Sequence, residues 1–174
     1  MPTTTLYGVA ASRAFRNIWM LNELGLAYEH DPVHYTDAKL KLPPYSDMNP
    51  NARIPMLKVG EHVMFESLAI NLYLARKHGG PLAPQTTEED GHATQWALWA
   101  ATELEEPIMV WAVNTLVKPE AERDHAAART AVEKIQRPLA ALEATLEKSA
   151  HLLGKRFTVA DVNTAAIMYR CLWM

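Results

Sequence analysis

The stretch MLKVGEHVMFESLAINLYLARKHGG, residues 56–80, contains two strand patterns followed directly by a helix pattern. Residues 56–59 and 62–65 are short apolar runs joined by a glycine-containing turn, which predicts a β-hairpin. In residues 66–78 the apolar side chains recur at helical spacing, and a pair of glycines ends the pattern. The sequence therefore predicts a β-β-α unit at this point of the chain.

The residues before this unit alternate between strand and helix patterns. Residues 3–7 are β-branched and aromatic, and residues 28–33 show a less regular pattern of the same kind, so we expect two strands. Between them, apolar residues recur at helical spacing from Ser12 up to Gly25. Residues 36–47 are interrupted by two prolines, which predicts a short or irregular helix. The first half thus predicts the order β-α-β-α-β-β-α.

The composition changes after this half, and only helix patterns follow. Residues 81–87 are rich in proline and polar side chains, which is typical of a linker. Residues 88–116 predict one long helix, kinked at Pro107. A further helix carries apolar side chains three and four residues apart over residues 132–146 and is expected to bend at Pro138.

The last predicted helix begins with a capping box. Thr158 can accept a hydrogen bond from the third helical amide, while Asp161 accepts one from the Thr158 amide. The residues that follow are apolar nearly all round, as in a helix at the centre of a core. Because this helix runs to Met174 without a C-cap glycine, the sequence is either truncated or a natural short form. We expect a two-domain protein of the α+β/all-α class: an α+β domain at 1–80, the linker at 81–87 and a truncated helical domain at 88–174.

Composition and charge exclude several classes of protein. The 174 residues carry a formal net charge of −3 without clustered lysine or arginine, which disfavours a nucleic-acid-binding module. No apolar run reaches the ~18 residues of a membrane span, and the N-terminus lacks the features of a secretory signal. We therefore expect a cytoplasmic protein with neither nucleic acid nor a membrane as partner. The single cysteine, Cys171, excludes an internal disulfide, and the seven histidines show no ligand spacing, so no metal site is expected.

Three short motifs can carry chemistry, and each also has a purely structural interpretation. Ser12 can cap the first helix or donate its hydroxyl to an anion held at that helix N-terminus. Ile54-Pro55 can be a simple turn, whereas a cis bond there would turn the Ile54 amide and carbonyl outward as a docking edge. Glu66-Ser67 can cap the third helix, or bind a zwitterionic amino acid through the Ser67 hydroxyl and the Glu66 carboxylate.

The long helix of the second half contains a further candidate face. Trp96, Trp99 and Glu103 are spaced to lie on one side of this helix. The tryptophans fit either a core or the wall of a binding site. Because an unpaired buried carboxylate is costly, we expect Glu103 to face a cavity, a cation or a subunit interface.

In order and spacing, these motifs resemble the glutathione transferase family, in particular its serine-type, theta-like bacterial members. The resemblance covers essentially the whole chain and rests on four segments: Leu6-Tyr7-Gly8 with Ser12-Arg13-Ala14, Asn49-Pro50 with Ile54-Pro55, Glu66-Ser67-Leu68-Ala69-Ile70, and Phe157-Thr158-Val159-Ala160-Asp161. It implies a thioredoxin-like N-terminal domain, an all-helical C-terminal domain and a homodimer. The last C-terminal helices of the family are absent from this sequence.

The resemblance also implies which residues bind glutathione. Ile54 and Pro55 would pair with the cysteinyl backbone of glutathione, and Glu66 and Ser67 would hold its γ-glutamyl end. Arg53 lies where relatives often have a basic residue near the glycyl carboxylate.

The same resemblance implies how the thiol is activated and where the second substrate binds. Ser12 would stabilise the glutathione thiolate, with Tyr7 as the alternative activator. Glu103 would reach across the dimer toward the glutathione of the partner. The electrophile pocket is expected between the first loop and the long helix, with the lining residues Val9, Ala10, Trp96 and Trp99.

The resemblance therefore predicts an enzyme that uses glutathione as co-substrate, without a metal, and conjugates it to small hydrophobic electrophiles. No cysteine lies near position 12, which argues against the members of the family that carry out thiol transfer. Two alternatives stay open at this point: a non-catalytic binding or docking module, and a glutathione-dependent peroxidase, isomerase or dehalogenase.

Overall fold

The structure, a computed structural model, describes residues 3–174. The chain divides into two compact units, Met1–Pro84 and Gln85–Met174, hereafter the first and the second unit. Each unit has a core of its own: Leu6 and Leu74 are fully buried in the first unit, and Leu104 and Val162 in the second.

The first unit is built on a four-stranded sheet with the strand order β2-β1-β3-β4. The strands are β1 (Thr4–Tyr7), β2 (Glu29–Asp31), β3 (Met56–Val59) and β4 (His62–Phe65). β1 pairs in parallel with β2 and antiparallel with β3, which pairs antiparallel with β4. A parallel pair needs a crossover connection, which α1 (Ala14–Glu23) supplies between β1 and β2.

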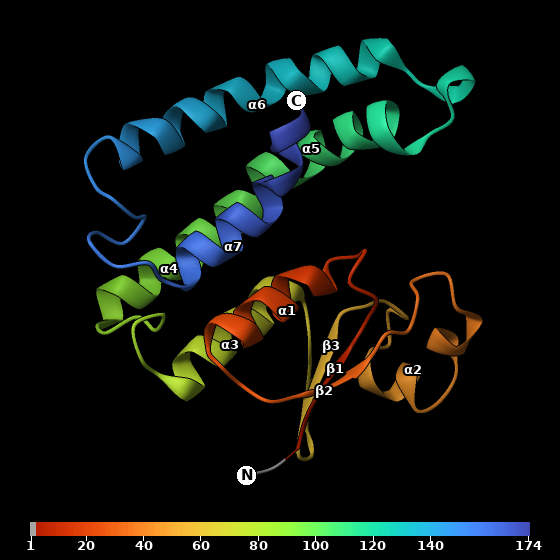
Figure 1. Cartoon of the computed structure of the whole chain (residues 1–174), viewed down its shortest axis with the longest axis vertical. Coiled ribbons are helices and arrows are strands. Elements are labelled where there is room, and N and C mark those ends of the chain that lie inside the picture. The colour runs from red at the N-terminus through yellow and green to blue at the C-terminus, as the bar shows by residue number, and fades with distance from the viewer. Residues whose placement is uncertain (1–2) are drawn as a thin grey trace. The chain divides into compact units, whose positions relative to one another are not determined.

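Helices cover both faces of this sheet (Figure 1). α1 packs side by side with α3 (Ser67–His78) on one face. The short α2 (Tyr45–Met48) and a 3-10 turn at Ala38–Lys41 lie on the other. The predicted order β-α-β-α-β-β-α and the thioredoxin-like fold are confirmed, and the hairpin has the predicted bounds.

The differences from the prediction lie where local signals compete. The first helix begins at Ala14, one residue later than an N-cap at Ser12 would place it, because residues 10–13 form a turn. The second strand is only three residues long. The region 36–47 forms two short helical pieces on either side of Pro43-Pro44, because proline cannot donate the backbone hydrogen bond that would continue a helix.

The second unit is helical throughout its regular structure. Its α-helices are α4 (Thr87–Trp99), α5 (Glu105–Ala112), α6 (His125–Leu146) and α7 (Val159–Met168). π-helical turns lie at Ala100–Leu104 and Val113–Val117, and 3-10 turns at Glu120–Glu122 and Tyr169–Trp173. α5 packs along α6, and α4 packs along α7 (Figure 1). The predicted all-helical C-terminal domain is confirmed.

The long helix predicted over residues 88–116 is irregular just before Pro107. The proline ring crowds the carbonyl group four residues earlier, and the proline has no N–H to donate. A π-helical turn at Ala100–Leu104 precedes it, and this wider turn gives the ring room. The predicted kink therefore takes the form of a π turn, whereas α6 continues through Pro138.

The capping box of the last helix is confirmed. The Asp161 carboxylate accepts a hydrogen bond from the Thr158 amide at 2.8 Å, and Thr158 Oγ1 accepts one from the Ala160 amide at 3.3 Å. The expectation of one helix to Met174 is wrong: α7 ends at Met168 and a 3-10 turn follows. Leu172 in that turn is 82% exposed, so the terminal turn is not part of the core.

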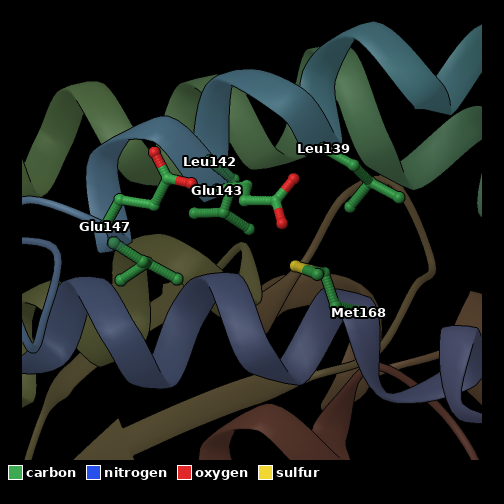
Figure 2. Close-up of a pocket in the computed structure, with 6 residues that line it drawn as sticks. Leu139, Leu142, Glu143, Glu147 and Met168 are labelled. Atoms are coloured by element: carbon green, nitrogen blue, oxygen red, sulfur yellow. The ribbon is translucent and has the colours of Figure 1, made fainter.

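The apolar stripe of α6 is only partly covered. Ile135 and Leu142 are buried, but Val132 and Leu146 at its ends are exposed. A hollow with a volume of about 510 Å³ lies between α6 and α7, and Figure 2 shows side chains that line it. It is lined by Leu139, Leu142, Leu146 and Met168, with the carboxylates Glu143 and Glu147 beside them.

Candidate functional site

The register of the sheet brings the predicted site residues to one end of the strands. Tyr7 at the end of β1 lies opposite Met56 at the start of β3, and Met56 lies opposite Phe65 at the end of β4. The loop after β1, the residues before β3 and the residues after β4 therefore leave the sheet at the same end. These three segments contain Ser12, Ile54-Pro55 and Glu66-Ser67.

Ser12 lies in the turn before α1, and its hydroxyl makes two local hydrogen bonds. Oγ donates to the Val9 carbonyl at 2.6 Å and accepts from the Ala14 amide at 3.1 Å. The predicted N-cap position is wrong by one residue, because Arg13 precedes the helix directly. The hydroxyl has one proton, so donation to a bound anion requires that proton to turn away from Val9.

Tyr7 is half-buried and packs against the apolar cluster of Val33, Leu40 and Met56. Its ring meets the Tyr45 ring edge-on, with 6.0 Å between the centroids. Tyr45 Oη donates to the Asp31 carboxylate at 2.8 Å, and this hydrogen bond raises the pKa of Tyr45 above its usual value. The surroundings of Tyr7 are those of a strand residue that contributes to a core.

The segment before β3 is held in place by Asn49, a residue of the quoted Asn49-Pro50 motif to which the sequence analysis gave no role. Asn49 is 3% exposed, and its Nδ2 donates to the Arg53 carbonyl at 2.8 Å. The Ile54–Pro55 bond is cis. Pro55 is buried, Ile54 is half-buried and Arg53 is exposed. The signal that could have indicated Asn49 is its position before a proline, since asparagine side chains often bond backbone groups in turns.

Glu66 and Ser67 mark the start of α3 and differ in their surroundings. Glu66 is exposed and has φ 73° and ψ 106°, a backbone conformation that residues other than glycine rarely adopt. Its side chain makes no capping hydrogen bond, which removes the structural interpretation of this carboxylate as a cap. Ser67 is buried and is the first residue of α3.

A buried polar cluster joins α1 to Ser67, and sequence reasoning missed it. Arg16 Nη1 donates to Ser67 Oγ at 3.1 Å, and Asn17 Nδ2 donates to the Ser67 carbonyl at 2.8 Å. Asn17 and Asn71 are fully buried. The signal for this cluster is the presence of polar residues within the apolar pattern of both helices, but their pairing joins residues fifty or more positions apart.

Comparison with known proteins places this arrangement in a family. The family model "Glutathione S-transferase, N-terminal domain" matches residues 2–76, and "Glutathione S-transferase, C-terminal domain" matches residues 104–172. Glutathione S-transferase 3 of Zea mays is 33% identical over 179 residues, which cover 96% of this chain and 78% of that protein. The chain belongs to the glutathione S-transferase family.

A solved member of the family supports the same assignment. The theta class glutathione S-transferase of Xanthomonas axonopodis pv. citri, crystallised with glutathione bound, is 31% identical and superposes with a TM-score of 0.90. The match covers 99% of this chain and 84% of that one. The family uses glutathione as its co-substrate. Another relative, Elongation factor 1-gamma 2 of Oryza sativa subsp. japonica, is 33% identical over 131 residues, 74% of this chain but 31% of that protein.

The remaining predicted site residues fall in both units. In the first unit, Val9 is half-buried and Ala10 is exposed. In the second unit, the half-buried Trp96 and Trp99 meet edge-on with 4.9 Å between ring centroids. The electrophile pocket that would join the two pairs stays a prediction.

Glu103 differs in its local structure from the regular α-helix that the prediction assumed. It is exposed and lies in the π-helical turn Ala100–Leu104. Because a π turn contains more residues than an α turn, the regular α-helical spacing from Trp96 to Glu103 does not hold over its whole length, and the shared face stays a prediction. Its exposure also removes the cost of burial on which the expectation of a compensating cavity or cation rested.

Residues 3–174 show neither a cluster of metal ligands nor a membrane-spanning helix. These residues contain no group of three or more histidine, cysteine, aspartate or glutamate side chains placed to hold a metal ion. Within the same residues, no helix has the length and apolar character needed to cross a membrane.

Proposed function

We propose that this protein conjugates the glutathione thiolate to small hydrophobic electrophiles. The observation that carries the proposal is the convergence of the Ser12 turn, Ile54-Pro55 and Glu66-Ser67 at one end of the sheet, in a chain of the glutathione S-transferase family.

In this proposal the first unit holds the three parts of glutathione in order. The Glu66 carboxylate binds the γ-glutamyl ammonium, and the Ser67 hydroxyl binds the α-carboxylate. Ile54 and Pro55 pair with the cysteinyl backbone, and the exposed Arg53 binds the glycyl carboxylate. The exposure of the Glu66 side chain without a capping role supports its assignment to a ligand.

The proposed role of Ser12 is to donate its hydroxyl proton to the thiolate. A free cysteine thiol has a pKa of about 8.5. A hydrogen bond to a charged group contributes about 1.5–3 kcal/mol. Since one pKa unit corresponds to ~1.36 kcal/mol, this bond lowers the pKa of the thiol by about one to two pKa units. The nearby N-terminus of α1 adds about 0.3–1 kcal/mol. Together these contributions make bound glutathione largely anionic near neutral pH, with Ser12 as a hydrogen-bond donor and not as a base.

The second substrate and the assembly complete the proposal. The electrophile binds beside the thiolate, with Val9, Ala10, Trp96 and Trp99 as its proposed lining residues. The active species is a cytoplasmic homodimer, in which Glu103 approaches the glutathione of the partner. The exposed position of Glu103 leaves its carboxylate available for such a contact.

One specific observation favours a second candidate, a glutathione-binding docking module with little turnover. The match to Elongation factor 1-gamma 2 covers 74% of this chain but only 31% of that protein. A domain of this kind therefore also occurs as part of a protein that is not named a transferase. A glutathione-dependent peroxidase, isomerase or dehalogenase would use the same thiolate on another substrate.

The experiment that tests the proposal is a conjugation assay with purified protein, glutathione and a panel of small aromatic and alkyl electrophiles. The proposal predicts formation of the thioether product at a rate above that without enzyme. Saturable glutathione binding with no conjugation across the panel would favour the docking module. Turnover of hydroperoxides alone would favour the peroxidase.

A further inference from the structure

Arg16 lies on α1 with its side chain enclosed in the first unit, and the residue is only 6% exposed. Its Nη1 donates a hydrogen bond to Ser67 Oγ at 3.1 Å. Ser67 is the first residue of α3 and is also buried. An almost buried cation therefore lies directly behind the hydroxyl to which the proposed function assigns the γ-glutamyl α-carboxylate.

This hydrogen bond limits what the Ser67 hydroxyl can do next. A guanidinium group has donors and no acceptor, so Ser67 Oγ must be the acceptor in the bond to Arg16. The proton of the Ser67 hydroxyl is then directed to a different atom. A carboxylate only accepts hydrogen bonds, so it matches a hydroxyl that has been turned into a donor in this way.

Two asparagines hold Arg16 and Ser67 in their relative positions. Asn17 Nδ2 donates to the Ser67 carbonyl at 2.8 Å and to Asn71 Oδ1 at 2.7 Å. Asn71 Nδ2 in turn donates to the Arg16 carbonyl at 3.1 Å. The backbones on both sides of the Arg16–Ser67 contact are thus tied across α1 and α3 by the protein's own hydrogen bonds, which reduces the ordering needed on binding.

The charge of Arg16 acts in the same direction as its hydrogen bond. A charge in the protein interior is screened less than one in water, so its potential at a group one hydroxyl away is strong. The N-terminus of α3, where Ser67 lies, also favours negative charge. Both contributions favour a carboxylate at the Ser67 hydroxyl and disfavour an ammonium there, which leaves the ammonium to the exposed Glu66.

We propose that Arg16 is a positioning residue for glutathione: it turns the Ser67 hydroxyl toward the γ-glutamyl α-carboxylate and supplies positive potential to that carboxylate. The inference rests on the proposed function, because it assumes that glutathione binds at Ser67. It adds a residue of α1 to the residues that determine ligand specificity. It predicts that Arg16 strengthens the binding of ligands that have the α-carboxylate and not of ligands that lack it.

The test compares two ligands on the full chain by isothermal titration calorimetry. The ligands are glutathione and γ-aminobutyryl-cysteinylglycine, which keeps the ammonium, thiol and glycyl carboxylate but lacks the α-carboxylate. Arg16→Gln is expected to weaken glutathione binding about tenfold or more, the loss expected of a hydrogen bond to a charged group, and to change analogue binding less than about twofold. Arg16→Lys keeps the charge without the guanidinium geometry. We expect it to lose, on a logarithmic scale, about half of the wild-type preference for glutathione over the analogue.

A matched control removes the same charge elsewhere on a neighbouring helix. Arg76 is exposed near the end of α3, nine residues from Ser67, and Arg76→Gln is expected to leave both affinities unchanged. A merely structural role of Arg16 predicts an equal loss for the two ligands, and this result would overturn the inference. Unchanged discrimination in both Arg16 variants would also overturn it.

The design separates failure of this inference from failure of the proposed function. If the wild-type protein binds neither ligand, the proposed function is wrong and the inference falls with it. If the wild type prefers glutathione to the analogue but the variants keep that preference, only the role of Arg16 is wrong. Where Arg16→Gln does not fold, as judged by circular dichroism, Arg16→Lys alone decides: wild-type discrimination contradicts the inference, and reduced discrimination supports it.

Discussion

Gly8 and Ile54 lie so close together that a Cβ atom on residue 8 would be 3.1 Å from the Cβ of Ile54. The same atom would be 2.9 Å from the Cβ of Ala14. Gly8 also has a φ of 134°, a conformation that residues with a side chain rarely adopt. The end of β1, the start of α1 and the segment before β3 therefore meet at one point that has no room for a side chain.

Gly8→Ala is expected to destabilise the first unit by about 1–3 kcal/mol from backbone strain alone, with the contact to Ala14 adding to this. The displaced Ile54 segment is also expected to weaken glutathione binding. Urea denaturation and calorimetric titration measure the two effects.

Gly91→Ala is a matched control for that substitution. Gly91 lies within α4, and a Cβ atom on residue 91 would have open space around it. The change is therefore expected to stabilise the protein by about 0.5–1 kcal/mol through helix propensity. Equal behaviour of the two alanine variants would contradict the close approach at Gly8.

Glu66 combines a strained backbone with a proposed binding role, so stability and binding should change in opposite directions. Its φ of 73° and ψ of 106° suit glycine better than glutamate. Glu66→Gly is expected to raise the free energy of unfolding by about 1 kcal/mol, while glutathione binds more weakly because the ammonium loses its carboxylate partner.

Glu66→Gln separates the two contributions, because it keeps the Cβ and its strain but removes the charge. It is expected to weaken binding without stabilising the fold. A stabilised Gly variant with unchanged glutathione affinity would remove Glu66 from the proposed site.

Glu89 is expected to make the second unit sensitive to acid. Its Oε2 accepts from the Gln85 amide at 2.8 Å and from Arg156 Nη2 at 2.6 Å. These contacts, the Gln85 amide first and Arg156 second, lower the pKa of Glu89 below its usual value. The stabilisation is therefore complete above the unfolded pKa of about 4.3 and is lost as pH falls through the lower, folded pKa.

Glu89→Gln is accordingly expected to lower the free energy of unfolding at pH 7 and to have a smaller effect at acid pH. Denaturation curves recorded across this range provide the measurement, with Glu133→Gln on an exposed site of α6 as the control for a lost surface charge. A difference between wild type and Glu89→Gln that stays constant with pH would contradict the assignment.

The parts of the fold that the sequence predicts correctly are those set by neighbouring residues. The hairpin at Met56–Phe65 and the capping box at Thr158 depend on turn chemistry and on residues within one helical turn. The π turn before Pro107 was missed because the sequence shows the proline but not how the helix makes room for it. Likewise, the exposed terminal turn at Tyr169–Trp173 contradicts an apolar pattern that is typical of a core helix.

The candidate site shows the same division. Ser12, Ile54-Pro55 and Glu66-Ser67 are short motifs beside predicted element ends, so the sequence alone indicates them. The Arg16–Ser67 contact joins residues 51 positions apart and depends on how α1 packs on α3. No local pattern predicts that packing, and the structure was needed to find it.

The central claim, that Ser12 stabilises a bound glutathione thiolate, is tested most directly by ultraviolet difference titration of glutathione across pH. We predict a thiolate absorption band in the wild-type protein at a pH below that expected for free glutathione. In Ser12→Ala the band is expected to appear at a pH higher by about one to two pH units, because one hydrogen bond to the charged thiolate is lost. Tyr7→Phe is expected to leave the band in place. An unchanged band in Ser12→Ala, or its loss in Tyr7→Phe alone, would contradict the account.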